Sequence, residues 1–504
     1  MGSRRLASAC VLVATVFASF AAHALPTAKP AIAATAVSAG RSDSSSLDWR
    51  SCHAELECAD LTRPAHLDDP AGPTISLAVA RIPAADPTSR IGVLMVNPGG
   101  PGVSGIAQLA GIRAALPTSV QDRFDLVAFD PRGTGATTPI DCGAALDPVF
   151  DLSFSPATVA QRDALVAAMQ DVATSCAAHN GTLLRDVSSV TAARDMDAVR
   201  DALGERQLNY LGYSYGTYLG ALYAALFPER VRALVLDGAI DPTLDAVGDT
   251  VLQATGFEKN LDKFLAWCSE PRDCEFGATN ATRAYDALRR RVAAEPIAAR
   301  GRDGRALNDT RFDAAVLQLL YGGRASWPAL ASGLAAAADG DGGPLLRVAD
   351  RFLGREPGGG DDGSLDAFWA VSCLDDPSFG DVAQAAATEE RARQAAPRLG
   401  AFVANFSLAC SVWSARTEPA GPSPADPVPA VTGVAPDALV VGGTADPATP
   451  LVSAKRLARE LGGASLVVAT TDQHTAVGSG IACVDRAFAE YLLEPRSHPG
   501  TRRC

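Results

Sequence analysis

The sequence predicts an α/β fold in which a mostly parallel sheet is flanked by helices. Residues 91–96 and 124–129 are short apolar runs that end in turn residues, as strands buried on both faces do. Segments with helical periodicity, such as 188–203, separate runs of this kind along the chain. Strands that alternate with helices indicate a parallel sheet, because each helix returns the chain across one face of the sheet.

The predicted elements follow one another in a regular order. Residues 75–82 alternate in polarity as a strand does, and the later strands are short apolar runs. The strands are expected at 75–82, 91–96, 124–129, 208–211, 231–236, 438–441 and 465–469, and the helices at 188–203, 217–227, 452–461 and 483–493.

The character of the chain changes after Asp241 and Pro242. Residues from about 243 to 417 are largely helical in pattern, with Gly- and Asp-rich breaks, and a Pro-rich stretch from Glu418 to Pro429 follows them. Strand and helix patterns then resume. We therefore expect residues 47–242 to form the first part of an α/β core, 243–429 a helical lid, and 430–504 the second part of the same core.

The N-terminus has the pattern of an export signal. Arg4 and Arg5 precede an apolar stretch, and Ala22 and Ala24 supply a small-x-small cleavage pattern, so residues 1–24 are predicted to be a signal peptide. The alternative is a membrane anchor, but the stretch is shorter than the roughly 20 residues that a span needs. Residues 25–46 are expected to form a mobile leader. No later stretch has the length and apolarity of a span, so a soluble exported protein, extracellular or periplasmic, is expected.

Composition excludes several classes of protein. With 504 residues, of which 47% are hydrophobic and 20% charged, the chain can bury a large core and is not disordered or fibrous. Its formal net charge of −13 argues against nucleic acid or anionic lipid as the main partner.

The cysteines favour disulfides. Cys10 lies in the signal segment, and an even number of cysteines remains, which is the expected pattern in an exported chain. A zinc site is disfavoured because no C-x-x-C occurs and the histidines are scattered. Pairing between sequence neighbours is the working hypothesis, although spacing alone does not determine connectivity. It gives Cys52–Cys58, Cys142–Cys176, Cys268–Cys274, Cys373–Cys410 and Cys483–Cys504.

Ser214 is the candidate nucleophile. It lies in Gly212-Tyr-Ser-Tyr-Gly216, the single G-x-S-x-G of the chain. The pattern alone is weak, but here it follows the predicted strand 208–211 and opens the predicted helix 217–227, which is the setting of a nucleophile elbow. Glycine on both sides allows a tight turn that exposes the serine oxygen, whereas the alternative is a Gly-rich turn without chemistry.

A serine hydroxyl needs a base, and the base needs a carboxylate to orient it. Folds with this elbow carry the three in the order serine, acid, histidine. His474 follows the strand 465–469 and is the predicted base, whereas His498 lies in a polar tail and is expected to be a surface residue. Asp446 follows the strand 438–441 and is the predicted acid. The alternative acids are Asp237 and Asp241, for which a turn or N-cap role suffices, and Asp472, which is too close to His474 in sequence.

The oxyanion of the reaction needs hydrogen-bond donors. One is expected to be the backbone N–H of Tyr215, the residue after the nucleophile. The other is expected from the loop after strand 91–96, at Gly99 and Gly100, since glycine lets the backbone approach the substrate carbonyl. A plain Pro- and Gly-rich loop is the alternative interpretation.

From about Trp49 to the C-terminus, the chain resembles the secreted tripeptidyl aminopeptidases and prolyl-aminopeptidase-like serine peptidases of the α/β-hydrolase superfamily. The resemblance implies an α/β-hydrolase fold with a large, mainly helical lid inserted after the sixth core strand. It also implies a triad on Ser214, Asp446 and His474 and the release of short peptides from free N-termini. The matching segments are 97–102, 129–135, 209–218, 236–242 and 443–450.

The chain departs from the prolyl-aminopeptidase pattern at two places. Pro98 stands where those enzymes carry histidine, which fits the tripeptidyl branch better, and Thr137 replaces a serine at the end of the motif that contains Arg132. Arg132 is expected to brace a loop and not to contact substrate.

An enzyme that acts on free N-termini must hold the substrate ammonium group, and a buried or half-buried carboxylate does this best. Asp375 and Asp376 lie in a lid segment, 370–377, that resembles a family element, and they are the hypothesis for this anchor. A helix-terminal or solvated acid pair is the equal alternative.

The first functional hypothesis is therefore an exported serine aminopeptidase without metal or organic cofactor. It is expected to be monomeric and to act on peptides or proteins with free N-termini. A carboxylesterase with the same triad is the second hypothesis. A non-catalytic binding or scaffold protein is the third, and the complete triad argues against it.

Overall fold

A computed structural model gives the fold. It describes residues 47–53, 55–270, 274–277, 280–300, 304–356, 359–413, 429–435, 437–495 and 500–504. The predicted signal peptide and leader, most of the Pro-rich stretch and His498 lie outside the described residues.

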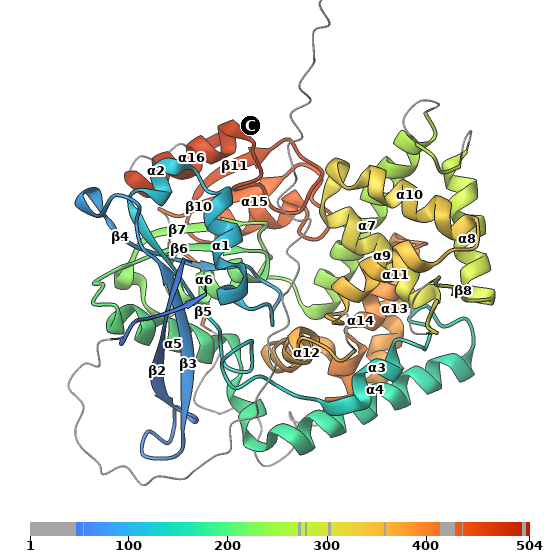
Figure 1. Cartoon of the computed structure of the whole chain (residues 1–504), viewed down its shortest axis with the longest axis horizontal. Helices are drawn as coiled ribbons and strands as arrows, with labels where there is room; N and C mark the ends of the chain where they lie inside the picture. The colour runs from blue at the N-terminus through green and yellow to red at the C-terminus, as the bar shows by residue number, and fades with distance from the viewer. Residues whose placement is uncertain are drawn as a thin grey trace, which may run out of the picture.

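One large sheet forms the core (Figure 1). Its ten strands run in the order β1-β2-β3-β5-β4-β6-β7-β10-β11-β12, and six of the nine neighbouring pairs are parallel, from β5 to β12. The strands are β1 (Arg50–His53), β2 (Leu56–Pro64), β3 (Thr74–Ile82), β4 (Gly92–Asn97), β5 (Phe124–Phe129), β6 (Leu208–Tyr213), β7 (Val231–Asp237), β10 (Leu439–Gly443), β11 (Ser465–Ala469) and β12 (Thr501–Arg503).

The predicted strands 124–129 and 465–469 are present with the predicted bounds, and the other predicted strands differ at their ends by one or two residues. Strands β1, β2 and β12 were not predicted from the sequence. The tripeptide Thr501–Arg503 has no apolar run, and it forms a strand because it pairs with β11 beside the Cys483–Cys504 disulfide.

Helices cover both faces of the sheet, because successive side chains of a strand point to opposite faces and both sets are apolar here. In β4, Leu94 and Val96 face the hydrophobic cluster under α1 and α16, whereas Val93 and Met95 face the cluster under α5, α6 and α15. The core helices are α1 (Gly105–Ala115), α2 (Thr118–Gln121), α5 (Ser189–Ala202), α6 (Tyr215–Leu226), α15 (Leu451–Glu460) and α16 (Ala482–Leu493).

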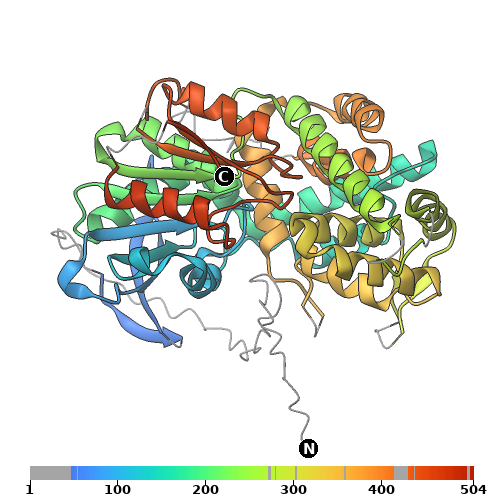
Figure 2. The ribbon, with the colours of Figure 1, turned by 90° about the horizontal axis from the view of Figure 1, so that it is seen from above.

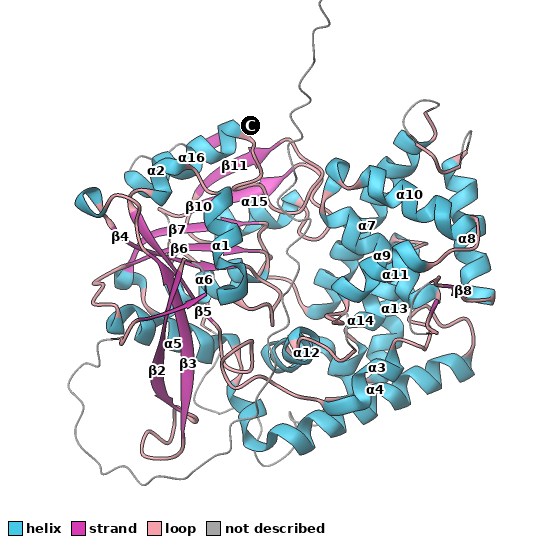
Figure 3. Ribbon diagram, viewed as in Figure 1, coloured by secondary structure: helices cyan, strands magenta, loops and turns pink. Residues whose placement is uncertain are grey.

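A mainly helical lid follows β7, which is the sixth strand counted from β2. The lid lies beside the core, and its helices contrast with the strands of the core in Figures 2 and 3. Its elements are α7 (Ala246–Cys268), α8 (Ala281–Ala294), β8 (Ile297–Ala298), β9 (Ala306–Leu307), α9 (Asp309–Tyr321), η5 (Gly323–Ala325), α10 (Trp327–Ala338), α11 (Gly343–Phe352), α12 (Ser364–Asp375), η6 (Pro377–Phe379), α13 (Val382–Ala395), α14 (Gly400–Phe406) and η7 (Leu408–Val412).

Two further helices lie against the lid, although the sequence analysis assigned their residues to the first part of the core. They are α3 (Leu146–Val149) and α4 (Val159–Asn180), seen beside α13 and α14 in Figure 1. Arg162 of α4 forms an ion pair with Glu389 of α13 at 2.6 Å, and the side chain of Asn405 donates to the carbonyl of Phe154 at 2.9 Å. These contacts join residues more than 200 positions apart, which local sequence patterns do not reveal.

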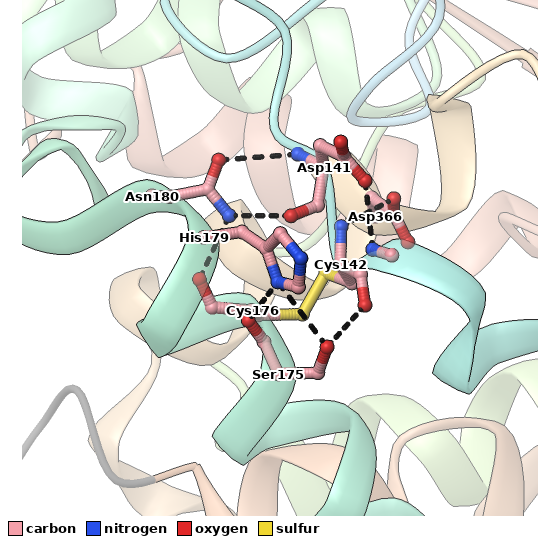
Figure 4. Close-up of a disulfide and its surroundings, with 8 residues drawn as sticks. Asp141, Cys142, Ser175, Cys176, His179, Asn180 and Asp366 are labelled. Carbon is pink, nitrogen blue, oxygen red and sulfur yellow. Dashed lines mark hydrogen bonds between the residues drawn. A yellow bond between two sulfur atoms is a disulfide. The ribbon is translucent and has the colours of Figure 1, made fainter.

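All five disulfides predicted by neighbour pairing are present. The Cys142–Cys176 bond ties the loop before α3 to α4 (Figure 4), where the backbone N–H of Cys142 also donates to Asp366 of α12 at 2.9 Å. The Cys373–Cys410 bond ties the other end of α12 to η7. Helix α12, which lies between the sheet and the rest of the lid in Figures 1 and 2, is therefore held near both ends.

Removal of the Cys373–Cys410 bond is expected to destabilise the protein strongly. The bond spans 37 residues, and the loop-entropy relation gives about 4 kcal/mol for a span of that size. Thermal and denaturant unfolding of Cys373→Ser/Cys410→Ser measures the loss. Cys52→Ser/Cys58→Ser is the control, because that bond spans only six residues and the same relation gives about 2 kcal/mol. A larger loss in the control would contradict the expectation.

Candidate active site

The candidate nucleophile lies in the predicted strand–turn–helix setting. Ser214 joins β6 to α6 with φ 54° and ψ −122°, a backbone conformation that non-glycine residues rarely adopt and that sharp nucleophile turns impose. A Cβ at Gly212 would lie 2.2 Å from the carbonyl oxygen of Gly216, and a Cβ at Gly216 would lie 2.9 Å from the carbonyl oxygen of Asn97. Both glycines are therefore required by the close approach of backbone atoms around the serine.

Main-chain hydrogen bonds fix the serine at the C-terminal edge of the sheet. The N–H of Ser214 donates to the carbonyl of Asp237 at the end of β7 over 2.9 Å. The hydroxyl of Thr217 donates to the carbonyl of Ser214 at 2.6 Å. The turn is thus braced from the neighbouring strand and from the helix that it opens.

Asp446 and His474 are in direct contact. Nδ1 of His474 lies 2.9 Å from both carboxylate oxygens of Asp446. Asp446 follows β10 and His474 follows β11, and these strands are parallel neighbours. Both loops therefore emerge at the same edge of the sheet, as the sequence analysis expected.

The Asp446 carboxylate is buried and oriented by several donors. It accepts the backbone N–H groups of Ala448 at 2.9 Å, Thr449 at 2.8 Å and Thr475 at 3.2 Å, and the hydroxyl of Thr449 at 3.1 Å. Because its oxygens accept these bonds, the carboxylate is held in one position as the acceptor for Nδ1–H of His474. This contact makes Nε2 of His474 the acceptor nitrogen of the neutral ring.

The ring of His474 is largely buried, with a side chain that is 10% exposed. Its Nε2 atom is buried and has no hydrogen-bond partner among the described residues. A Cβ at Gly238 would lie 3.0 Å from Cε1 of the ring, so the ring lies at the end of β7, the strand next to β6, which leads into Ser214. Desolvation lowers the pKa of His474, but the charge of Asp446 and the hydrogen bond to it outweigh that effect and raise the pKa above its usual value.

The alternative acids have other partners. Asp237 is buried beneath the histidine loop, and one of its oxygens accepts the N–H groups of Ala476 and Val477, each at 2.7 Å. Its other oxygen has no partner among the described residues. Burial raises the pKa of Asp237 to about 6. Asp237 thus anchors the loop that carries His474 and does not bond to the ring.

Asp241 and Asp472 serve the surrounding structure. Asp241 accepts the N–H and the hydroxyl of Thr243, at 3.0 and 2.6 Å, and pairs with Arg456 at 3.0 Å. Asp472 accepts the N–H of Arg324 in the lid at 3.1 Å. The first arrangement is the turn role that the sequence analysis gave as sufficient for Asp241.

The loop after β4 lies against the serine turn. A Cβ at Gly99 would lie 3.0 Å from Cβ of Ser214 and 3.3 Å from the backbone nitrogen of Tyr215. Gly99 and Gly100 have φ values of 95° and 108°, so both need the freedom of glycine.

The two loop glycines are not equivalent as donors. The N–H of Gly99 donates to the side chain of Asn97 at 2.9 Å, so it is already engaged. The N–H groups of Gly100 and Tyr215 make no hydrogen bond to any described residue. The available donor pair is therefore Gly100 and Tyr215, and Gly99 supplies the close approach. The role of Asn97 was not predicted; its signal in the sequence is its place at the end of β4, two residues before Gly99.

Asp375 is connected to the serine turn. It ends α12, and its carboxylate accepts the N–H of Ser189 at 2.7 Å and the hydroxyl of the same residue. That hydroxyl is also hydrogen-bonded to the phenol of Tyr215. Burial raises the pKa of Asp375 to about 7, and the nearby charge of Asp376 adds to the effect.

Asp376 has a different environment. Its Oδ1 atom accepts the N–H of Ser378 at 2.7 Å and the hydroxyl of Ser378 at 2.5 Å, so it caps the 3-10 helix η6. This is the helix-terminal role that the sequence analysis kept as the alternative for the acid pair.

Arg132 braces a loop, as expected. Its guanidinium donates to Asp195 and to the carbonyls of Pro64 and Ala65, and it is almost wholly buried.

In the part of the chain that the structure describes, no group of three or more His, Cys, Asp or Glu side chains is arranged to hold a metal ion. No helix in the same part has the length and apolarity needed to cross a bilayer.

The α/β-hydrolase fold family matches residues 92–478, so the chain belongs to that family. This match confirms the superfamily that the sequence motifs indicated, and the chain is a hydrolase of this family.

Three relatives illustrate the activities with which the fold is associated. The chain is 34% identical to the serine protease Hip1 of Mycobacterium tuberculosis over 470 residues, covering 89% of this chain and 87% of the relative. It is 36% identical to a carboxylesterase B of the same species over 481 residues, covering 90% and 89%. It is also 36% identical to a tripeptidyl aminopeptidase of Streptomyces lividans over 249 residues, covering 46% and 44%.

Asp446→Asn is expected to lower kcat by about 10⁴-fold, as loss of the orienting carboxylate does in serine hydrolases. The predicted base, His474, accepts a proton only in its neutral form, so activity is expected to fall as the pH drops through its raised pKa. Removing the charge that raises this pKa moves the acidic limb of the kcat/KM profile to lower pH. The measurement is the pH–rate profile of the variant.

Asp237→Asn is the matched comparison, because the amide oxygen can still accept the N–H groups of Ala476 and Val477. We expect a much smaller loss of kcat. A larger loss in Asp237→Asn than in Asp446→Asn would exchange the roles of the two acids.

Proposed function

We propose that this protein is an exported serine peptidase that releases short peptides, tripeptides in particular, from free N-termini through a Ser214–His474–Asp446 triad. The observation that carries the proposal is the buried contact between Asp446 and His474 at 2.9 Å, at the edge of the sheet where Ser214 occupies its strained turn. Acyl transfer requires a carboxylate, an imidazole and an alcohol that act in this order.

In the proposed mechanism, the hydroxyl of Ser214 attacks the scissile carbonyl while Nε2 of His474 removes its proton. Asp446 keeps Nδ1–H of the ring oriented and stabilises the imidazolium that forms. The N–H groups of Gly100 and Tyr215 stabilise the developing oxyanion. His474 then protonates the leaving amine, and a water molecule, activated by the same ring, hydrolyses the acyl-enzyme and releases the N-terminal peptide.

Selectivity for free N-termini is proposed to come from Asp375. What supports this is that Ser189 links the carboxylate of Asp375 to the phenol of Tyr215, the residue after Ser214, and that Asp375 is only partly buried. Burial deprives this carboxylate of hydrating water. A substrate ammonium group bound there would take the place of that water and would stabilise the ionised form of Asp375. Asp376 is a weaker candidate because it already caps η6. The tripeptidyl aminopeptidase relative supports the peptide length, over the part of the chain that it matches.

A carboxylesterase is the second candidate, and the relative named carboxylesterase B favours it. The same triad cleaves esters and amides, so the distinction lies in substrate binding and not in the catalytic groups. A non-catalytic protein is the least supported alternative.

Export is proposed from the N-terminal signal pattern together with the five disulfides, which persist in oxidising compartments. The same proposal holds that the protein acts as a monomer and uses no cofactor.

Ser214→Ala is expected to reduce turnover by about 10⁴- to 10⁶-fold, because the nucleophile is lost while binding persists. Chromogenic mono-, di- and tripeptides and a simple ester, assayed side by side, measure both the loss and the substrate preference. A fluorophosphonate probe should label the wild type and not the variant. Near-normal turnover by the variant would remove the triad. Failure to label the wild type would favour a binding protein, and a preference for the ester would favour the esterase.

Asp375→Asn is expected to raise KM for a tripeptide substrate with a free N-terminus and to leave its N-acetylated form unaffected. The pKa of Asp375 is raised to about 7, so in the wild type the same KM should rise as the pH falls through that value and the carboxylate is protonated. Asp376→Asn is the control, with little effect expected on either substrate. Equal responses of the free and acetylated substrates to Asp375→Asn would reject the anchor.

A further inference from the structure

The lid does more than cover the candidate site, because it contacts both loops that carry the acid and the base. Helix α7 lies against the acid loop so closely that a Cβ at Gly256 would be 2.3 Å from the carbonyl oxygen of Pro447. The other contacting element is η5, where a Cβ at Gly323 would be 2.6 Å from the backbone nitrogen of Gln473. Both lid glycines thus mark places where backbone meets backbone.

Asn260 lies one helical turn after Gly256, on the same face of α7. Its side-chain Nδ2 donates to two main-chain carbonyls, that of Ala445 at 3.0 Å and that of Asp472 at 2.7 Å. Ala445 immediately precedes Asp446, and Asp472 lies two residues before His474. One amide group therefore bridges the acid loop and the histidine loop.

The bridge is buried and has no freedom to adjust. Asn260 is only 1% exposed, and its Oδ1 atom has no partner among the described residues. Reversing the amide would turn that oxygen toward two carbonyl oxygens, so the orientation with both N–H groups donating is enforced. A buried amide that leaves its oxygen unsatisfied costs free energy, and the two bonds to the loops are what offset this cost.

A second lid contact acts on the same histidine. The N–H of His474 donates to the carbonyl of Tyr321 at 2.8 Å, and the Tyr321 ring packs edge-on against the imidazole with ring centroids 5.2 Å apart. Phe257, which lies between Gly256 and Asn260 in sequence, packs in the same way against Tyr321 at 5.2 Å. Helix α7 thus supports His474 through Tyr321 as well as through Asn260.

We infer that Asn260 is a positioning residue for the reaction, which holds the acid and histidine loops in register from the lid. The inference rests on the proposed triad. It makes the lid a part of the catalytic framework: if the bridge is lost, Asp446 and His474 remain in the protein but their alignment with Ser214 relaxes. Misplacement of a catalytic group by about 1 Å can cost about 100-fold in rate.

The experiment compares Asn260→Ala with Asn405→Ala. Asn405 is an equally buried lid amide whose Nδ2 also donates two bonds, to the carbonyl of Phe154 and to Glu389, far from the two loops in sequence. Both variants should lose comparable thermal stability. Only Asn260→Ala should lower kcat, by about 10- to 100-fold, while KM for the best substrate of the panel stays within about twofold. Its rate of labelling by the fluorophosphonate should fall in parallel.

Two further measurements separate positioning from folding. The acidic limb of the kcat/KM profile should move to lower pH in Asn260→Ala, since a loosened contact with Asp446 no longer raises the pKa of His474 as much. Gly256→Ala, which pushes α7 away from Pro447, should show the same kinetic signature. Gly333→Ala is its control, because there the added methyl meets only the flexible Leu345 side chain of the lid.

Wild-type kcat and an unshifted pH profile in Asn260→Ala would overturn the inference, as would equal kinetic losses in Asn260→Ala and Asn405→Ala. Loss of the folded state in Asn260→Ala with wild-type kinetics in Gly256→Ala would assign Asn260 a purely structural role and overturn it too. Failure of the proposed function gives a different pattern. In that case the fluorophosphonate does not label the wild type, or Ser214→Ala keeps near-normal turnover, whatever the kinetics of Asn260→Ala.

Discussion

The buried contact between Asp446 and His474 is the interaction on which the candidate site depends. A carboxylate without water is stable only where donors replace its hydration, and here three backbone N–H groups and a threonine hydroxyl do so. The same donors determine where the oxygens point and therefore which edge of the imidazole can donate to them. The turn after Asp446 and the bonds from Asp237 to the histidine loop both help to keep this pair in place.

Several carboxylates around the site are held where ionisation is costly. Burial raises the pKa of Asp237 to about 6 and that of Asp375 to about 7, and Asp366, which bonds to the loop of the Cys142–Cys176 disulfide, is raised to about 7. Each accepts backbone N–H groups from a different element. Asp237 therefore connects two segments of the core, whereas Asp375 and Asp366 connect α12 of the lid to segments that precede the lid in sequence.

The lid and the core share one hydrophobic cluster, which runs from the helices on one face of the sheet into the lid. Helix α12 is tied by a disulfide near its C-terminal end and by Asp366 near its N-terminal end, and Gly102 of the loop after β4 lies against its first turn. Contacts of this kind fix the lid relative to the serine turn. A side chain at Gly102 would collide with the backbone of α12, which explains why glycine occupies this position.

Local sequence was enough to predict the strands β5 and β11 and the strand–turn–helix setting of Ser214, because alternation and turn residues act over a few residues. The five disulfides agree with the hypothesis that sequence neighbours pair, although spacing alone did not determine their connectivity. What only the tertiary structure decided is different in kind. That α4 packs against the lid, that Asn97 occupies the N–H of Gly99, and that Asn260 bridges carbonyls 185 and 212 residues away all depend on surfaces that meet after folding. Hydrogen bonds to main-chain carbonyls leave no side-chain pattern on the acceptor residue, so one chain carries no sign of them until its backbone is in place.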